Sequence, residues 1–283
     1  MVRAEEVFDL LFYRPLAFLF VKLIYRTPIT PNQVTVLSGV TGLAAAWMFS
    51  IGGTAAIGWG ALWYAIANIL DCSDGQLARL QQSGTLLGRL VDGVTDYVSS
   101  VAILIGIGIG LAASGASAWW LVIAAGVSSA LHAMFFDHYQ SEFISTVRGQ
   151  RNFLEGELEQ FSAELERLGR VGSNPVRIAL LSMYVRYLRL QKSSSTKQMN
   201  THIDPMTYGS KNFLMIRFWS FLGPTTNRTL LIVCALLGTL HSYLWIVVTI
   251  GNAWLLAAYL LQRNIHRRLG RRKTTVTETL PTQ

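Results

Sequence analysis

Three long stretches without a charged side chain limit what this sequence can fold into. Residues 27–70, 97–136 and 229–262 contain no Asp, Glu, Lys or Arg, and they are 44, 40 and 34 residues long. A helix needs about 20 mostly apolar residues to cross the hydrocarbon core of a bilayer. Each stretch therefore suits two spans joined by a short turn. The sequence predicts an all-α polytopic membrane protein with six transmembrane helices.

Glycine and proline residues place the ends of these helices. Thr30 or Asn32 can cap a helix that has Pro31 in its first turn, and Gly52 with Gly53 marks the turn that follows. The predicted spans cover about residues 33–51, 55–77, 86–111, 117–140, 213–239 and 243–262. Three glycines in the third span permit close helix packing or a local kink: Gly106, Gly108 and Gly110.

Two further regions are amphipathic rather than uniformly apolar. Residues 5–26 are apolar but carry three basic side chains and a proline, which favours an interfacial helix within residues 1–30 over a first transmembrane span. Residues 141–211 hold ten Lys or Arg and seven Asp or Glu, and we predict a cytoplasmic helical insertion there. The first half of this insertion forms one apolar stripe at helical spacing: Phe153, Leu154, Leu158, Phe161, Leu165 and Leu168.

The distribution of charge predicts the orientation. The basic side chains all lie on one side if residues 31–140 hold four spans and residues 212–265 hold two, so both termini and the basic tail at 266–283 are expected in the cytoplasm. We also expect no cleavable signal peptide. The net charge of +8 fits this bias and attraction to anionic lipid, and it does not require nucleic acid. Cys72 and Cys234 suggest no disulfide framework.

Four aspartates stand at the cytoplasmic end of the second and third spans. Asp71 and Asp74 are three residues apart, and Asp92 and Asp96 are four apart, so each pair shares one face of a helix. Carboxylates at membrane depth are costly and usually functional. Two acidic faces turned toward each other would repel, and a hard divalent cation between them is the simplest remedy.

The residues between the aspartates complete a fixed pattern: Asp71-x2-Asp74-Gly75-x2-Ala78-Arg79-x8-Gly88-x3-Asp92-x3-Asp96. This pattern resembles the signature of the CDP-alcohol phosphotransferase family, also called the CDP-alcohol phosphatidyltransferases, at every position. The segment TPITPNQVT resembles the family's link between its interfacial helix and its first span. The resemblance covers residues 1–140 and 212–262, whereas the insertion at 141–211 is longer than a minimal member needs.

The resemblance implies a reaction and a set of roles. An alcohol attacks a CDP-linked phosphoryl group and CMP leaves, in an enzyme of phospholipid biosynthesis that uses two Mg²⁺ or Mn²⁺ ions and forms a homodimer. Asp71, Asp74 and Asp92 are implied as metal ligands, and Asp96 as general base and further ligand. Small and polar residues would receive the nucleotide: Gly75, Ala78, Arg79, Gly88, Pro31, Asn32, Thr35 and Asn68. Arg79 suits bidentate phosphate binding. An equally good interpretation of Asn68 is a polar contact between packed helices. The alternative for Pro31, Asn32 and Thr35 is an ordinary helix start.

The acceptor is less well specified. One cluster of polar residues either lines the acceptor pocket or forms an ordinary polar helix end: His132, Asp137, His138 and Glu142. Arg217 is a candidate for an acceptor phosphate. For Arg177, Arg186 and Arg189, contact with anionic lipid headgroups is the favoured interpretation.

Three functions follow in order of preference. The first is transfer of phosphatidyl from CDP-diacylglycerol to a polyol phosphate such as glycerol phosphate or inositol phosphate, favoured by the arginine-rich cytoplasmic face. The second is transfer of a choline or ethanolamine headgroup from its CDP derivative to diacylglycerol. The third, from a different class, is a cation-coupled transporter, since buried carboxylates also mark ion pathways. A transporter would not need the glycine, alanine and arginine of the pattern, and we see no inverted repeats.

Overall fold

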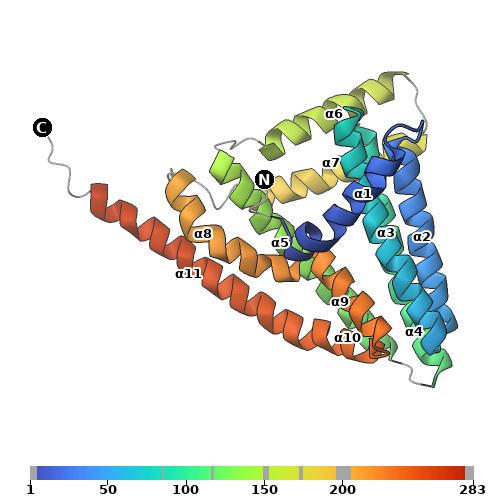
Figure 1. Ribbon diagram of the computed structural model, residues 1–283. Helices are drawn as coiled ribbons and strands as arrows, with labels where there is room; N and C mark the ends of the chain where they lie inside the picture. The colour runs from blue at the N-terminus through green and yellow to red at the C-terminus, as the bar shows by residue number, and fades with distance from the viewer. Residues whose placement is uncertain are drawn as a thin grey trace, which may run out of the picture. The chain divides into compact units, whose positions relative to one another are not determined.

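The computed structural model describes residues 5–84, 86–115, 118–148, 153–171, 175–195 and 205–277, and every regular element in these ranges is a helix (Figure 1). The predicted all-α class is therefore confirmed. The elements are η2 (Asp9–Tyr13), α1 (Arg14–Ile24), α2 (Pro31–Ile51), α3 (Thr54–Leu80), α4 (Leu86–Ala113), α5 (Trp119–Arg148), α6 (Phe153–Val171), α7 (Pro175–Ser195), α8 (Pro205–Trp219), η3 (Ser220–Leu222), α9 (Pro224–Leu236), α10 (Leu240–Ile246), η4 (Val247–Gly251) and α11 (Asn252–Thr277).

Five helical segments in the described part of the chain are long and apolar enough to cross a membrane. They cover Pro31–Ile51, Thr54–Leu80, Gly88–Ala113, Trp119–Val147 and Leu240–Arg267. They coincide with five of the six predicted spans, whose ends are correct to within a few residues in most cases. The number of spans is therefore five by length and composition, and the sixth stays a prediction.

The segment at 213–239 accounts for the difference. The sequence predicts one span there, but the chain forms α8, the short 3₁₀ turn η3 and α9, with a break at Gly223 before Pro224. Proline has no backbone N–H to continue a helix and is well suited to begin one. α9 has 13 residues, or about 20 Å at 1.5 Å per residue, which is shorter than the hydrocarbon core.

The chain divides into two compact units. The first contains residues up to Tyr139 together with Ile216–Tyr259, and the second contains Gln140–Met215 and the chain from Leu260 onward. The second unit thus includes the C-terminal part of α11 as well as the segment at 141–211, and the predicted boundaries of the insertion stay a prediction. Within it α6 and α7 occupy the two predicted helical stretches, and Phe161 and Leu168 of the predicted stripe are buried.

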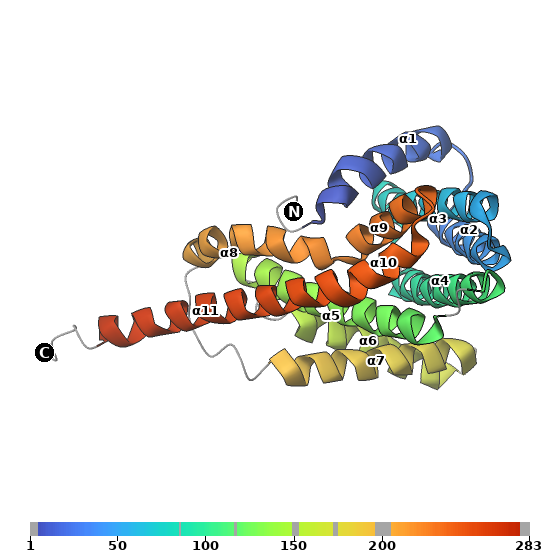
Figure 2. The same cartoon turned by 90° about the horizontal axis from the view of Figure 1, so that it is seen from below.

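In the first unit, α2 packs against both α3 and α4, and the three helices lie side by side in both views (Figures 1 and 2). Thr30 caps α2 in a capping box with Gln33, which decides between the two predicted caps. Gly52 and Gly53 have φ values of +71° and +75°, so the turn into α3 needs residues without a Cβ.

Glycines on α4 set its distance from α2. A methyl group on Gly106 would overlap the carbonyl oxygen of Ala46, and one on Gly110 would overlap that of Phe49. The two backbones therefore touch directly, as in small-residue packing of membrane helices. The third glycine, Gly108, faces the ring of Trp119 instead. These glycines serve contacts within one chain.

We predict that Gly110→Ala destabilises the protein, whereas Gly58→Ala does not. The added methyl at Gly110 would overlap the α2 backbone, and overpacking of this kind costs about 1–3 kcal/mol. Gly58 is also helical, but an added Cβ there meets nothing within 4 Å, so alanine is expected to be neutral or slightly stabilising. Thermal unfolding of the detergent-solubilised variants measures the difference, and equal midpoints would contradict the proposed packing constraint.

Candidate active site

The four aspartates of the pattern lie on two neighbouring helices of the first unit. Asp71 and Asp74 belong to α3, and Asp92 and Asp96 belong to α4. The side chain of Asp71 is 24% exposed and that of Asp96 is 38% exposed, so the site is open to solvent on the Asp96 side. Asp92 lies close enough to interact with Asp71. Asp71 on α3 therefore lies near both aspartates of α4.

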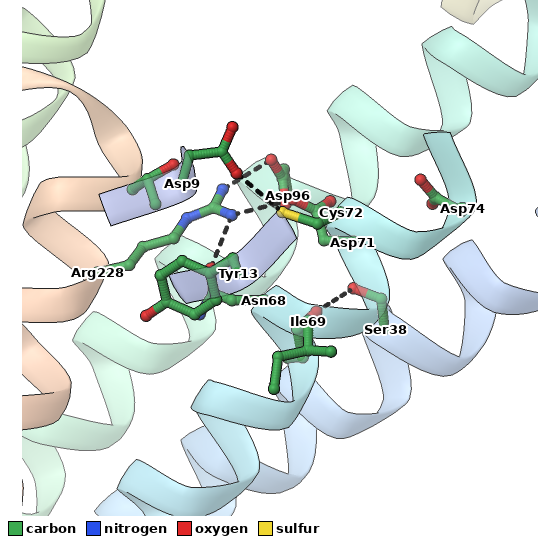
Figure 3. A network of polar contacts seen from close by, with 12 residues as sticks. Asp9, Tyr13, Ser38, Asn68, Ile69, Asp71, Cys72, Asp74, Asp96 and Arg228 are labelled. Carbon is green, nitrogen blue, oxygen red and sulfur yellow. Dashed lines mark hydrogen bonds and ion pairs between the residues drawn. The ribbon is translucent and has the colours of Figure 1, made fainter. Parts of the chain in front are cut away.

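In Figure 3 the side chain of Asp74 points away from Asp71, Asp96 and Arg228, although Asp74 still lies near enough to Asp92 for their charges to interact. It is buried and accepts a hydrogen bond from the hydroxyl of Thr35 on α2. Thr35 was predicted as a nucleotide-site residue from its place in the segment that begins at Pro31. The structure brings it to the aspartate helix, one turn beyond Pro31 and Asn32 at the start of α2.

A fifth charged side chain, Arg228 of α9, reaches into the cluster (Figure 3). Its Nη2 donates to Oδ2 of Asp96 at 2.6 Å, and its Nη1 lies 3.3 Å from Oδ2 of Asp71. The same Nη1 donates to the side-chain oxygen of Asn68 at 3.0 Å. The Arg228 side chain is only 15% exposed, so one guanidinium from a third helix joins the two aspartate helices.

Sequence reasoning selected Arg217 and overlooked Arg228 as a site residue. Arg217 donates to the backbone carbonyl of Glu5 at 3.1 Å. Arg228 is the last charge before the apolar stretch 229–262, and an isolated arginine within a predicted span is a functional signal in its own right. That signal was present, but nothing in the local pattern pairs residue 228 with residues 71 and 96.

The other pattern residues surround the cluster on α3 and α4. Arg79 is exposed and folds back over Gly75, where an added Cβ would lie 3.6 Å from its Nη1. Ala78 is half-buried, and Gly88 lies in the first turn of α4. Asn68 also donates to the backbone oxygen of Tyr64 at 2.7 Å, so it both braces α3 and holds Arg228. Its two predicted roles are compatible.

Four of the five predicted acceptor residues lie on α5. His132 is buried in α5, where its Nε2 lies 3.0 Å from Oδ1 of Asn252 on α11 and its ring packs on Gly251. His138 packs edge-on against the ring of Tyr139.

Two further acceptor candidates lie near the end of α5. Asp137 is on the same helix as His132, in the first unit. Glu142 belongs to the second unit, where it accepts a hydrogen bond from Tyr208 at 2.8 Å and pairs with His266 at 3.3 Å. The contacts of His132 and Glu142 thus join α5 to other helices.

The donor atoms at the site suit a hard divalent cation. Carboxylate, amide and hydroxyl oxygens are what Mg²⁺ and Mn²⁺ prefer, and no thiolate or imidazole is among the predicted ligands. Among the described residues, no three His, Cys, Asp or Glu side chains are already grouped around one point as a ligand set. The chemistry of the residues therefore fits such an ion, and its coordination is part of the proposal below.

Cys72 adjoins the cluster without entering it. Its thiol lies 3.2 Å from a carboxyl oxygen of Asp9, and Asp9 also accepts from Arg14 at 2.8 Å. A thiol engaged by a carboxylate in this way is a packing contact between α3 and the N-terminal segment, and no disulfide involves it or Cys234.

The fold and this site together indicate the class of protein. Five apolar helices characterise an integral membrane protein, and a carboxylate and arginine cluster between its helices marks a membrane-embedded site for charged ligands. Residues 28–150 match the sequence profile of the CDP-alcohol phosphatidyltransferases, so this part of the chain carries a domain of that family. The domain indicates a transferase of substituted phosphate groups in phospholipid synthesis, and the family uses CDP-linked donors.

Curated relatives agree with this assignment. The phosphatidylinositol phosphate synthase of Corynebacterium glutamicum is 29% identical over 170 residues, which is 59% of this chain and 70% of the relative. Proteins of Mycobacterium bovis and Mycobacterium tuberculosis that are provisionally named as cardiolipin synthases are 30% identical over 100 residues. That match covers 35% of this chain and 44% of theirs, less than half of their length. The family match favours a transferase over the transporter alternative.

We predict that Arg228→Met lowers the unfolding free energy by about 2–4 kcal/mol in the presence of a chelator. Methionine retains much of the volume but leaves two partly buried carboxylates without their counter-charge, and breaking such a pair is strongly destabilising. Arg170→Met is the matched control, because Arg170 is 83% exposed and its ion pair with Glu166 is long at 3.8 Å. Denaturant titration in detergent compares the two. Equal stability would contradict a structural role for the Arg228 pairs.

Proposed function

We propose that the protein transfers a phosphatidyl group from CDP-diacylglycerol to the hydroxyl of a phosphorylated polyol, such as glycerol phosphate or inositol phosphate, and releases CMP. The observation that carries this proposal is the placement of Arg228 at Asp96 and Asp71. It puts a fixed positive charge beside the carboxylate that the family pattern marks as the base. The name of the corynebacterial relative, a phosphatidylinositol phosphate synthase, supports an acceptor that itself carries phosphate.

Asp96 is proposed to take the proton from the acceptor hydroxyl. Its side chain is the more exposed of the two that pair with Arg228, so a water-soluble alcohol can approach it. Arg228 fixes the orientation of this carboxylate through the 2.6 Å contact. Phosphoryl transfer depends mainly on positioning and charge stabilisation, and an oriented base next to a guanidinium supplies both.

Asp71, Asp74 and Asp92, with Asp96, are proposed to hold Mg²⁺ or Mn²⁺, as one or two ions. Such an ion, when bound, neutralises the pyrophosphate of the donor and stabilises the departing CMP. Asp92 lies near both Asp71 and Asp74, and Thr35 holds the Asp74 carboxyl group through a hydrogen bond.

The nucleotide is proposed to lie along the α3 face that carries the small residues of the pattern. Gly75 and Ala78 leave room for a base or ribose on this face, Gly88 at the start of α4 is proposed to contribute as well, and Arg79 is exposed over Gly75, in reach of a phosphate. Pro31, Asn32 and Asn68 complete the set proposed from the family pattern. A polar site at the end of membrane-length helices suits a reaction with one lipid and one water-soluble substrate.

The location and assembly are also proposals. The basic residues predict that the site and both termini face the cytoplasm. A homodimer is supported by the family resemblance alone, because Gly106 and Gly110 are used for packing within the chain.

We predict that Asp92→Asn abolishes metal-dependent CMP release and weakens Mn²⁺ binding. The substitution keeps the shape of the side chain but removes a charge that the cation needs, so a loss of about 10³-fold or more in rate is expected. CMP release is followed by chromatography, Mn²⁺ binding by electron paramagnetic resonance, and folding by thermal unfolding. Glu164→Gln, on α6, is the control and should change none of the three. Retained activity would remove Asp92 from the metal site.

The acceptor is identified by incubating purified protein in mixed micelles with CDP-diacylglycerol and a panel of alcohols. We expect CMP release with glycerol phosphate or inositol phosphate, and little with free glycerol, inositol or serine, because the unphosphorylated alcohols cannot pair with a guanidinium. Parallel reactions supply CDP-choline or CDP-ethanolamine with diacylglycerol. If only these produced CMP, the donor and acceptor classes proposed here would be wrong.

A further inference from the structure

A buried glutamate from the start of the chain meets the helix that carries Arg228. Glu6 is 6% exposed, and its carboxyl oxygens accept from the backbone N–H of Thr225 at 3.1 Å and of Thr226 at 2.8 Å. The hydroxyl of Thr226 donates to it at 3.0 Å as well. Thr225 and Thr226 are in the first turn of α9, whose N–H groups have no partner within the helix.

α9 lacks a cap of its own. The residue before Pro224 is Gly223, which has no side chain to accept these hydrogen bonds. A Cβ on Gly223 would overlap the Glu6 carboxyl group, so the glutamate fills the place that a local capping side chain would occupy. Glu6 thus acts as the N-cap of α9 from more than 200 residues away in sequence.

Burying the Glu6 carboxyl group costs free energy. Burial raises the pKa of the Glu6 carboxyl above its ordinary value, and the hydrogen bonds from Thr226 and Thr225 oppose that shift. A glutamate buried at this depth is tolerated only where donors surround it, as the helix end does. An alanine or glutamine here would avoid most of the cost, which indicates that the contact serves more than packing.

Further contacts of the same segment bracket the site. The hydroxyl of Tyr13 lies 3.1 Å from that of Thr229, the residue directly after Arg228. On the aspartate helix, Gln76 donates to the backbone oxygen of Arg14 at 3.2 Å, and Cys72 contacts Asp9. Residues 6–14 therefore contact α9 on both sides of Arg228 and α3 just beyond Asp71.

We propose that Glu6 is a positioning residue for catalysis: by capping α9 it sets the register at which Arg228 meets Asp96 and Asp71. Arg228 lies less than one helical turn after the capped amides, so a frayed first turn would displace its side chain. The guanidinium must span from α9 to both α3 and α4, and a small shift would break one of its two ion pairs. The expected effect on the rate of CMP release rests on the proposed function. The expected effect on the first turn of α9 rests on geometry alone.

The experiment moves the cap from one residue to the other. Glu6→Ala removes the distant cap and is expected to lower CMP release about tenfold. Gly223→Asp alone is also expected to impair the enzyme, because its Cβ overlaps Glu6. In the double variant Glu6→Ala/Gly223→Asp, the introduced aspartate has room and lies at the N-cap, where φ of −68° and ψ of 156° suit any residue. It is expected to recover at least half of the wild-type rate.

Amide hydrogen exchange of α9, followed by mass spectrometry, supplies a readout that does not depend on activity. Glu6→Ala should speed exchange in the first turn of α9, and the double variant should restore protection there. Glu166→Ala, at an exposed glutamate on α6, is the control and should alter neither measurement. An aspartate at position 223 can cap α9 but cannot hold the N-terminal segment in place. Recovery by the double variant would therefore show that Glu6 acts by capping α9 and not by tethering that segment.

The outcomes distinguish the two proposals. If the wild-type protein releases no CMP with any donor and acceptor, the proposed function fails, while the exchange data still test the cap. If Glu6→Ala leaves α9 exchange unchanged, or if it lowers the rate and the double variant does not recover it, the positioning role is overturned. The positioning role is supported if Glu6→Ala lowers both the rate of CMP release and the exchange protection of α9, and the double variant restores both.

Discussion

The contact of Arg228 with Asp96 and Asp71 is the interaction on which the rest of the site depends. Carboxylates this close together in a partly buried setting repel one another, and each costs free energy to remove from water. One guanidinium from α9 offsets both charges at distances of 2.6 and 3.3 Å. Both ion pairs form only if α3, α4 and α9 keep their relative positions. The packing of these helices therefore determines whether Arg228 can reach both carboxylates.

The small residues along α2 provide much of that constraint. A Cβ on Gly39 would overlap the Thr95 side chain, and one on Gly42 would crowd Ser99. Thr95 adjoins Asp96 in sequence, so the approach of α2 fixes the turn of α4 that carries the base. The same helix supplies Thr35 to Asp74. α2 thus organises both aspartate helices although it contributes no charge to the site.

The parts that could be predicted from the sequence were those that depend on local pattern. Long charge-free stretches locate membrane-length helices, and a three- or four-residue spacing places carboxylates on one helical face. The helix break within the segment predicted at 213–239 has a local cause too, since Gly223 and Pro224 signal a break that the apolar composition outweighed. The pairing of Arg228 with Asp71 could not be predicted, because it joins residues 157 positions apart in sequence.

The same distinction explains why the donor half of the reaction is easier to infer than the acceptor half. The nucleotide and metal residues follow one another within a single motif on two adjacent helices, so one stretch of sequence specifies their geometry. The basic group beside the base comes from α9, and the position of α9 depends on Glu6 at the opposite end of the chain. A substitution near either end can therefore alter the acceptor side while the aspartate motif is unchanged.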